Sequence, residues 1–303
     1  MFAIITLFAA TLRVATPLLF AALGETLVER AGVLNLGIEG TMFIGAMVGF
    51  VAAYFSGSLW LGVVAAGVAG ALVGLLMALL VVYLGVNQHV AGLGLTLLMT
   101  GLALYLFRII FGAQQVPPKI EPFAQPNLAA WLGPVAPIFE QYTLTYVALL
   151  LAPGLWWLLK RTHFGLRVRA VGENPSAADV AGVNVFRTRL LALVIGGALM
   201  GLGGAFLSLA QLGAFTFGII AGRGWVAIAL VIFGNWSPAK VLWGALLFGG
   251  FQALELRLQA SGFQLPYQAL LALPYLVTIA ALALAGRNVN APSALLKPYQ
   301  REA

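Results

Sequence analysis

Residues 58–84 read SLWLGVVAAGVAGALVGLLMALLVVYL and contain no charged side chain. A helix rises 1.5 Å per residue, so about 20 residues cross the roughly 30 Å hydrocarbon core of a bilayer. This stretch is long enough, and it predicts a transmembrane helix. Gly70 and Gly74 are four residues apart, which opens a flat strip where a second helix can approach closely.

The rest of the chain has a similar composition. Of its 303 residues, 62% are hydrophobic and 8% are charged, whereas soluble domains carry about 25% charged residues. A water-soluble globule is therefore excluded. Comparable apolar stretches occur at about 2–24, 33–55, 89–111, 142–160, 190–212, 239–256 and 267–286. We predict an all-α polytopic membrane protein, a bundle of about 8–10 transmembrane helices with one short cytoplasmic helix.

Two sequence features add detail to the predicted helix bundle. The apolar segment 218–235 is interrupted by Arg223 and by glycines, so it is either a short span or a re-entrant segment. Small residues four apart recur in pairs, which predicts close helix packing and no particular chemistry. These pairs are Gly45 and Gly49, Gly197 and Gly201, and Gly218 and Gly222.

The basic residues indicate the topology. The chain carries a formal net charge of +7, but its Lys and Arg residues lie mostly in loops, which is a membrane-orientation signal and not a nucleic-acid signal. We place the loop 160–189 and the tail 291–303 in the cytoplasm, and the N-terminus outside. The proline-rich loop 112–141 is predicted to be an extended outer cover. Residues 1–290 are then one transmembrane domain.

Motifs for catalysis are missing from the sequence. There is no cysteine, and the two histidines, His89 and His163, are far apart, so we expect no metal site. The chain has no phosphate-binding G-x-x-x-x-G-K-[ST] motif, and it lacks the H-E-x-x-H and G-x-S-x-G motifs. We expect no cofactor in this chain and a pathway through the membrane in place of an active site.

The first polar cluster is GETLVERAGVLNLGIEG, residues 24–40. We expect Glu25, Glu29 and Arg30 to form a solvated turn at the cytoplasmic edge. Glu39 lies nine residues beyond Arg30, roughly 13 Å deeper in a helix. A carboxylate at that depth needs a partner or a water-filled cavity. We therefore expect Glu39 to line the translocation pathway or to form a structural ion pair. The alternative is that Glu39 lies less deep, at the membrane interface.

The second polar cluster is RTHFGLRVRAVGENPSAADVAGVNVFRTR, residues 161–189. Asn174 followed by Pro175 predicts a helix N-cap with proline at the first helical position, and Gly182 fits the residue just past the helix end. The short helix between them is small and mostly uncharged. It suits a groove on another protein, and the alternative is a helix lying on the membrane surface.

Other polar residues interrupt the apolar stretches. Trp225 follows Arg223, a pair typical of a membrane-interface anchor, although a substrate contact stays open. From polarity within the spans, the candidates for the translocation pathway are Glu39, Asn35, Trp225 and Asn235.

Five segments in order resemble the permeases of bacterial ATP-binding cassette (ABC) importers, and the resemblance covers nearly the whole chain. The closest subgroup is the nucleoside or simple-sugar permeases. The segments are residues 24–40, GLRVRAVGENPSAADVAGVNV (165–185), GGALMGLGGAFLSL (196–209), GWVAIALVIFGNWSP (224–238) and APSALLKPY (291–299).

The resemblance implies partners and a mechanism. Residues 173–182 would be the coupling helix, which docks into a separate ATP-binding subunit that holds ATP and Mg and hydrolyses the ATP. A second homologous permease would complete the pathway by alternating access, and an extracytoplasmic lipoprotein would deliver the small-molecule substrate at the bacterial inner membrane. The implied coupling residues are Gly172, Glu173, Asn174, Pro175, Ala177, Ala178 and Gly182.

The substrate and the energy source remain open at this point. The coupling loop does not distinguish a nucleoside or simple-sugar permease from a monosaccharide or branched-chain amino acid permease. An ion-coupled secondary transporter is the alternative from another class, because an intramembrane carboxylate such as Glu39 would suit it. A membrane-embedded enzyme would need a cluster of catalytic residues.

Overall fold

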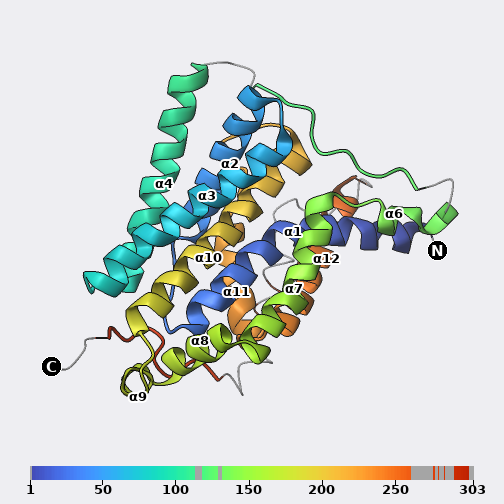
Figure 1. Ribbon diagram of the computed structural model, residues 1–303. Helices are drawn as coiled ribbons and strands as arrows, with labels where there is room; N and C mark the ends of the chain where they lie inside the picture. The colour runs from blue at the N-terminus through green and yellow to red at the C-terminus, as the bar shows by residue number, and fades with distance from the viewer. Residues whose placement is uncertain are drawn as a thin grey trace.

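The computed structural model describes residues 2–112, 118–128, 132–260 and 290–299, together with Leu276, Ile279 and Ala283. Seven helices in this part of the chain are long and apolar enough to cross a membrane (Figure 1). They are α1 (Phe2–Arg30), α2 (Ile38–Ser56), α3 (Leu59–Ala78), α4 (Gln88–Phe111), α7 (Thr143–Arg161), α10 (Val185–Ala205) and α12 (Pro238–Ala260).

This architecture confirms an all-α polytopic membrane protein. Two of the long helices continue without a break into π-helical turns, α3 through Leu79–Tyr83 and α10 through Phe206–Leu212. The predicted span at 267–286 falls almost entirely outside the described residues.

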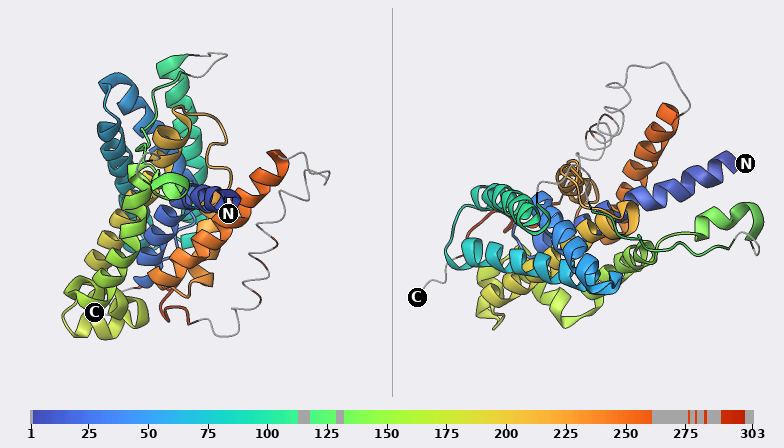
Figure 2. Two further views of the ribbon diagram at one scale, coloured as in Figure 1. Left: turned by 90° about the vertical axis from the view of Figure 1, so that its right-hand side faces the viewer. Right: turned by 90° about the horizontal axis from the view of Figure 1, so that it is seen from above.

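The centre of the bundle is built by α1, α2, α3 and α10, and glycines set the distances between them. A methyl group on Gly70 of α3 would lie 2.1 Å from the carbonyl oxygen of Gly197 on α10, and one on Gly45 of α2 would lie 2.6 Å from the Cα atom of Gly201. Backbones this close exclude any side chain at these positions. The predicted close packing at these pairs is confirmed. Around this centre, α4 packs on α2, and α7 and α12 pack on α1 (Figure 2).

Residues 213–233 cross part of the bundle in two different conformations. Residues 213–222 are not helical, and α11 (Arg223–Phe233) follows with 11 residues. Such a helix is about 16 Å long, half the hydrocarbon thickness. The segment predicted at 218–235 is thus a half-length helix with an irregular chain before it. The predicted helical packing strip at Gly218 and Gly222 is wrong, because both have left-handed backbone angles, φ +78° and +79°.

The loop after α4 is extended, as predicted, over residues 118–128, but the prediction is wrong for residues 133–139, which are helical. Lys119 forms an isolated antiparallel bridge with Ala214, and the Phe123 N–H donates to the carbonyl of Leu209 at 3.0 Å. The Phe123 ring also packs edge-on against Trp60, with 5.2 Å between centroids. Two short helical turns follow this stretch, Gly133–Val135 and α6 (Ala136–Phe139).

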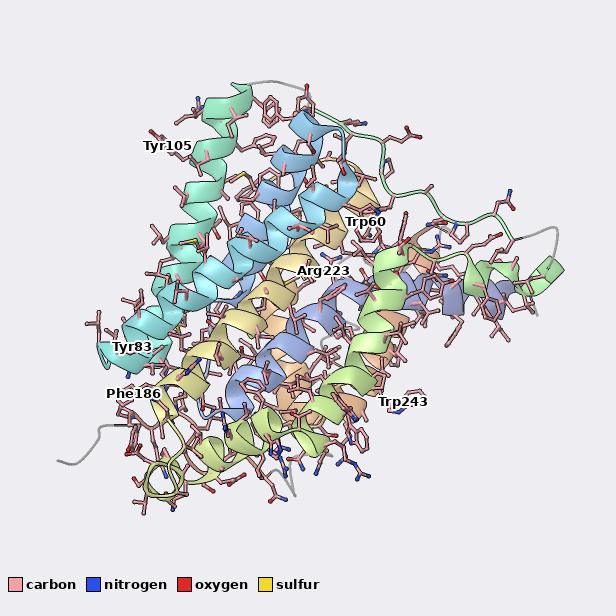
Figure 3. The ribbon with its side chains drawn as sticks, viewed as in Figure 1. Trp60, Tyr83, Tyr105, Phe186, Arg223 and Trp243 are labelled. Carbon is pink, nitrogen blue, oxygen red and sulfur yellow. The ribbon has the colours of Figure 1, made fainter. Side chains whose placement is uncertain are left out.

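Two consecutive short helices and a segment far from them in sequence gather at one end of the bundle (Figure 1). They are α8 (His163–Glu173), α9 (Pro175–Val180) and residues 290–299, and we call this the α8–α9 end. The ends of α1 and α11 lie there too. Figure 3 shows Tyr83 and Phe186 side by side close to α9, with ring centroids 5.8 Å apart.

Candidate functional site

The helix α9 has the local structure that its sequence predicts. The Asn174 Oδ1 atom accepts a hydrogen bond from the Ala177 N–H at 3.0 Å, and Pro175 occupies the first turn. Gly182 has φ +84° just past the end of the helix. Both cap predictions are confirmed. A side-chain acceptor satisfies one of the N–H groups that a helix start leaves without a partner, and glycine adopts the left-handed angle without strain.

One face of α9 packs inward and the other is exposed. Ala178 is 5% exposed and packs with Val171 of α8 and Val185 of α10. On the outer face, Val180 is 91% exposed and Ala177 is also exposed. Among the predicted coupling residues, Gly172 and Ala178 are therefore buried under the surface, whereas Glu173, Asn174, Ala177 and Gly182 lie on it.

A groove runs between α8 and α9, with a volume of about 550 Å³. Its walls combine apolar side chains with a few charged and polar ones near the ends. The lining residues are His163, Leu166, Arg167, Ala170, Glu173, Asn174, Ala177, Ala178, Ala181 and Val183. A mostly apolar groove beside an exposed capped helix is suited to receive part of another protein.

Residues 290–299 hold α8 and α9 in place. The Glu173 carboxylate accepts hydrogen bonds from the Ser293 hydroxyl at 3.0 Å and from the Ser293 N–H at 3.3 Å. The Tyr299 hydroxyl donates to Asp179 of α9 at 2.9 Å, and the Tyr299 ring packs against Phe186 with centroids 5.7 Å apart. The tail therefore contacts both short helices and the start of α10, which the sequence did not indicate.

The α8–α9 end is in direct contact with α1. A methyl group on Gly172 would lie 2.1 Å from the carbonyl oxygen of Arg30, the last residue of α1. The Arg189 guanidinium donates from Nε to the carbonyl of Ala31 at 3.1 Å and from Nη1 to that of Lys297 at 3.4 Å. The backbones of α8 and α1 are thus in direct contact at Gly172.

Glu39 lies beside the N-terminus of α11. Its Oε1 atom accepts from the Gly222 N–H at 2.8 Å and its Oε2 atom accepts from the Gly224 N–H at 2.7 Å. A helix N-terminus carries a partial positive charge, so a carboxylate there is stabilised by charge and by hydrogen bonds. Gly224 permits this approach, because a methyl group there would lie 2.5 Å from the Glu39 nitrogen.

The other three pathway candidates lie in different places. Asn35 is 2% exposed, and its Oδ1 atom accepts from the Gly37 N–H at 2.8 Å, stabilising the turn before α2. Trp225 is 43% exposed on the first turn of α11. Asn235 follows the far end of the same helix, where its Oδ1 atom accepts from the Asn290 N–H at 3.0 Å. The structure therefore brings only Glu39 and Trp225 to the same end of α11.

The expected solvated turn at Glu25 and Glu29 is wrong, because both carboxylates are buried, at 0% and 1% exposure. The helix α1 continues through them to Arg30, and distant segments cover them. Glu25 Oε1 accepts from the Asn35 N–H at 2.8 Å, and Glu29 accepts a hydrogen bond from the Trp236 indole.

The end of α1 is thereby fixed to the turn between α11 and α12. Besides the indole bond to Glu29, the Arg30 Nε atom donates to the carbonyl of Trp236 at 2.9 Å. Trp236 itself has a left-handed backbone angle, φ +52°, and is 3% exposed. A chain of contacts therefore runs from α9 through α8, α1 and α11 to Glu39 on α2.

No group of three or more His, Asp or Glu side chains in the described part of the chain could hold a metal ion. The arrangement offers mechanical contacts between helices and a surface for a partner.

Comparisons with known proteins agree on one family. Residues 7–282 match the model for the permease component of branched-chain amino acid transport systems. A putative glucose ABC transporter permease of Haloferax volcanii is 41% identical, with 97% of each chain covered. A guanosine ABC transporter permease of Bacillus subtilis is 36% identical over 96% of this chain and 95% of its own.

A second guanosine ABC transporter permease of the same Bacillus subtilis strain is 27% identical over 80% of this chain and 71% of its own. No solved structure matches.

Proposed function

The chain belongs to the family of permease components of branched-chain amino acid transport systems, and we propose that its own substrate is a nucleoside or a related simple sugar. It is a permease subunit of an ABC importer. The observation that carries this conclusion is the similarity over almost the entire chain to permeases named for glucose and guanosine. An ion-coupled transporter has no comparable support.

The environment of Glu39 favours a neutral substrate over an amino acid. Helix N-termini at membrane depth attract anionic groups such as a substrate carboxylate. At α11, the Glu39 carboxylate already accepts the N–H groups of Gly222 and Gly224. That helix end is therefore occupied by the protein itself, and nucleosides and simple sugars carry no carboxylate that would need it.

We propose that ATP is bound, with Mg, and hydrolysed by a separate subunit that receives α9. The exposed face of α9, with Ala177 and Val180, and the groove beside it would form the contact. This proposal places the α8–α9 end and the tail 291–303 in the cytoplasm, with the protein in the cytoplasmic membrane. The basic residues of α8 support this orientation.

A second, homologous permease would complete the pathway, and an extracytoplasmic substrate-binding lipoprotein would deliver the substrate. The match of two guanosine permeases of one organism to this chain supports a pair of different permeases. Within this chain, residues 1–290 would act as one transmembrane domain.

The contacts suggest how closure of the ATP-binding subunits would open and close the pathway. Movement of α9 would displace α8, which touches Arg30 of α1 at Gly172. Through Glu29 and Arg30, α1 would carry the movement to Trp236 and hence to α11. The far end of α11 is bonded to Glu39, so α2 would move with it.

The test is ATP-dependent uptake by the purified membrane complex reconstituted in vesicles, with labelled guanosine or labelled glucose. Unlabelled ribose and leucine serve as competitors. We expect uptake that needs ATP and a co-purified ATP-binding subunit, and that leucine does not reduce. Competition by leucine would instead assign a branched-chain amino acid, and uptake driven by an ion gradient without ATP would contradict the proposal.

A further inference from the structure

A small basic pocket lies between the ends of α1, α7 and α8 and the turn before α12, and it shares only Glu173 with the groove beside α9. Its volume is about 200 Å³. Cationic side chains, indole rings and small apolar residues share its wall. The lining residues are Arg30, Trp156, Leu159, Lys160, Arg169, Glu173, Trp236, Ser237 and Pro238.

Positive charge exceeds negative charge in this pocket. Arg30, Lys160 and Arg169 line it together with a single carboxylate, that of Glu173. The carboxylate already accepts two hydrogen bonds from Ser293. The buried Nε atom of Arg169 has no hydrogen-bond partner among the described residues. Arg30 already donates from Nε and Nη2 to the carbonyls of Trp236 and Asn235, so the donors that remain for a ligand are those of Arg169 and Lys160. An arginine donor without an acceptor, beside a lysine, is well suited to bind a phosphate group.

The tryptophans fix the depth of the pocket. Trp156 and Trp157 on α7 and Trp243 on α12 are 41%, 58% and 70% exposed, and Figure 3 shows Trp243 directed away from the bundle. Exposed tryptophans mark the membrane–water interface. Lys160 is one helical turn beyond Trp156, about 6 Å further toward the α8–α9 end. The headgroup layer is of similar thickness, so we expect the cations to lie among the lipid headgroups.

We propose that this pocket binds the phosphate of an anionic phospholipid. Free phosphate offers the same charge, but the walls favour a lipid. Trp156, Leu159 and Pro238 provide apolar contact next to the cations, which suits a phosphate that continues into a glycerol backbone and acyl chains. A bound lipid here would join α1, α7, α8 and the α11–α12 turn, the elements that link α9 to the membrane interior.

The experiment uses the purified membrane complex, without ATP. Native mass spectrometry measures how many phosphatidylglycerol or phosphatidylcholine molecules stay bound after both are supplied in equal amounts. We expect wild type to retain phosphatidylglycerol preferentially, and Lys160→Gln combined with Arg169→Gln to reduce that retention about tenfold. Arg161→Gln is the matched control, because it removes a charge from the adjacent residue, which does not line the pocket.

A titration with inorganic phosphate distinguishes a site for a phospholipid from a site for free phosphate. Millimolar phosphate that leaves phosphatidylglycerol bound supports the lipid site, whereas displacement by phosphate at that concentration would overturn the lipid assignment in favour of a free anion. Equal retention of both lipids by wild type, or equal loss in the Arg161→Gln control, would also overturn it. If the double variant fails to assemble, Lys160→Gln alone, at an exposed position, keeps the test open with a smaller expected loss.

Discussion

Two short helices in this protein are capped at their N-termini by polar side chains. These side chains differ greatly in how far along the sequence they lie from the helix that they cap. The helix α9 is capped by Asn174, three residues before the N–H that it binds. The helix α11 is capped by Glu39, 183 and 185 residues away in sequence, on another transmembrane helix. A local cap fixes where a helix starts. A distant carboxylate fixes where a helix lies within the membrane, so the two caps have different consequences when removed.

The largest effect is expected at the distant cap. Glu39→Ala leaves the Gly222 and Gly224 N–H groups without their acceptors in a half-buried site, and each bond to a charged group is worth about 1.5–3 kcal/mol. We expect a marked loss of thermal stability and at least a tenfold loss of uptake. Thermal unfolding of the purified complex and vesicle uptake measure the two effects.

The variant Glu39→Gln sharpens this test, because it keeps one acceptor oxygen. A capping role predicts that stability and uptake fall together and by less than in Glu39→Ala. A direct role of Glu39 in the pathway predicts instead that Glu39→Gln loses uptake at unchanged stability. Wild-type behaviour of Glu39→Ala in both measurements would contradict either role.

The next largest effect is expected on the exposed face of α9. Val180 is 91% exposed, so Val180→Asp leaves the fold intact but places a charge where we propose that the ATP-binding subunit docks. A central interface residue contributes about 2 kcal/mol, roughly a thirtyfold change in affinity. We expect co-purification of that subunit to fall accordingly. Ser176→Asp, exposed on the same helix, is a charge-matched comparison that locates the interface.

The buried face of α9 makes a useful contrast. Ala178→Arg would disturb the packing with Val171 and Val185, so it should reduce the stability of the permease itself. If Val180→Asp lowered stability as much as Ala178→Arg, the assignment of the two faces would be wrong.

The local cap of α9 is expected to matter less. Asn174→Ala removes one acceptor, and such changes cost about 1 kcal/mol. We expect a small loss of stability and a loss of ATPase stimulation of a few fold, because α9 would fray. Asn174→Asp keeps an acceptor and should behave as wild type. Equal losses in both variants would show that the amide acts through something other than the cap.

The same contrast explains what the sequence could predict. The apolar stretches predict the described long helices to within about six residues at each end, and Asn174, Pro175 and Gly182 predict α9, because these signals are local in sequence. The expectation that Glu25 and Glu29 are solvated is wrong, because Asn35 and Trp236 bind their carboxylates only in the folded chain.

Gly218 and Gly222 also show that local sequence spacing does not determine the structure. Their four-residue spacing suggests a helix, but it says nothing about a backbone that bends into left-handed angles before α11. The hydrogen-bond partners of Glu39 could not be predicted from the sequence either, because only the tertiary fold brings the Gly222 and Gly224 N–H groups to its carboxylate. Spacing predicts local conformation, whereas burial and partners depend on helix packing.

The smallest effect is expected at the tail, where the partners are 120 residues apart but lie on the surface of the α8–α9 end. Tyr299→Phe removes the hydroxyl that donates to Asp179 and keeps the ring that packs on Phe186. Such a bond is worth about 1 kcal/mol, so the complex should assemble normally. If the tail positions α9, the number of substrate molecules transported per ATP should fall about twofold. Asp179→Asn keeps an acceptor for the hydroxyl and should preserve that ratio, whereas an unchanged ratio in Tyr299→Phe would show that the ring contact alone holds α9 in place.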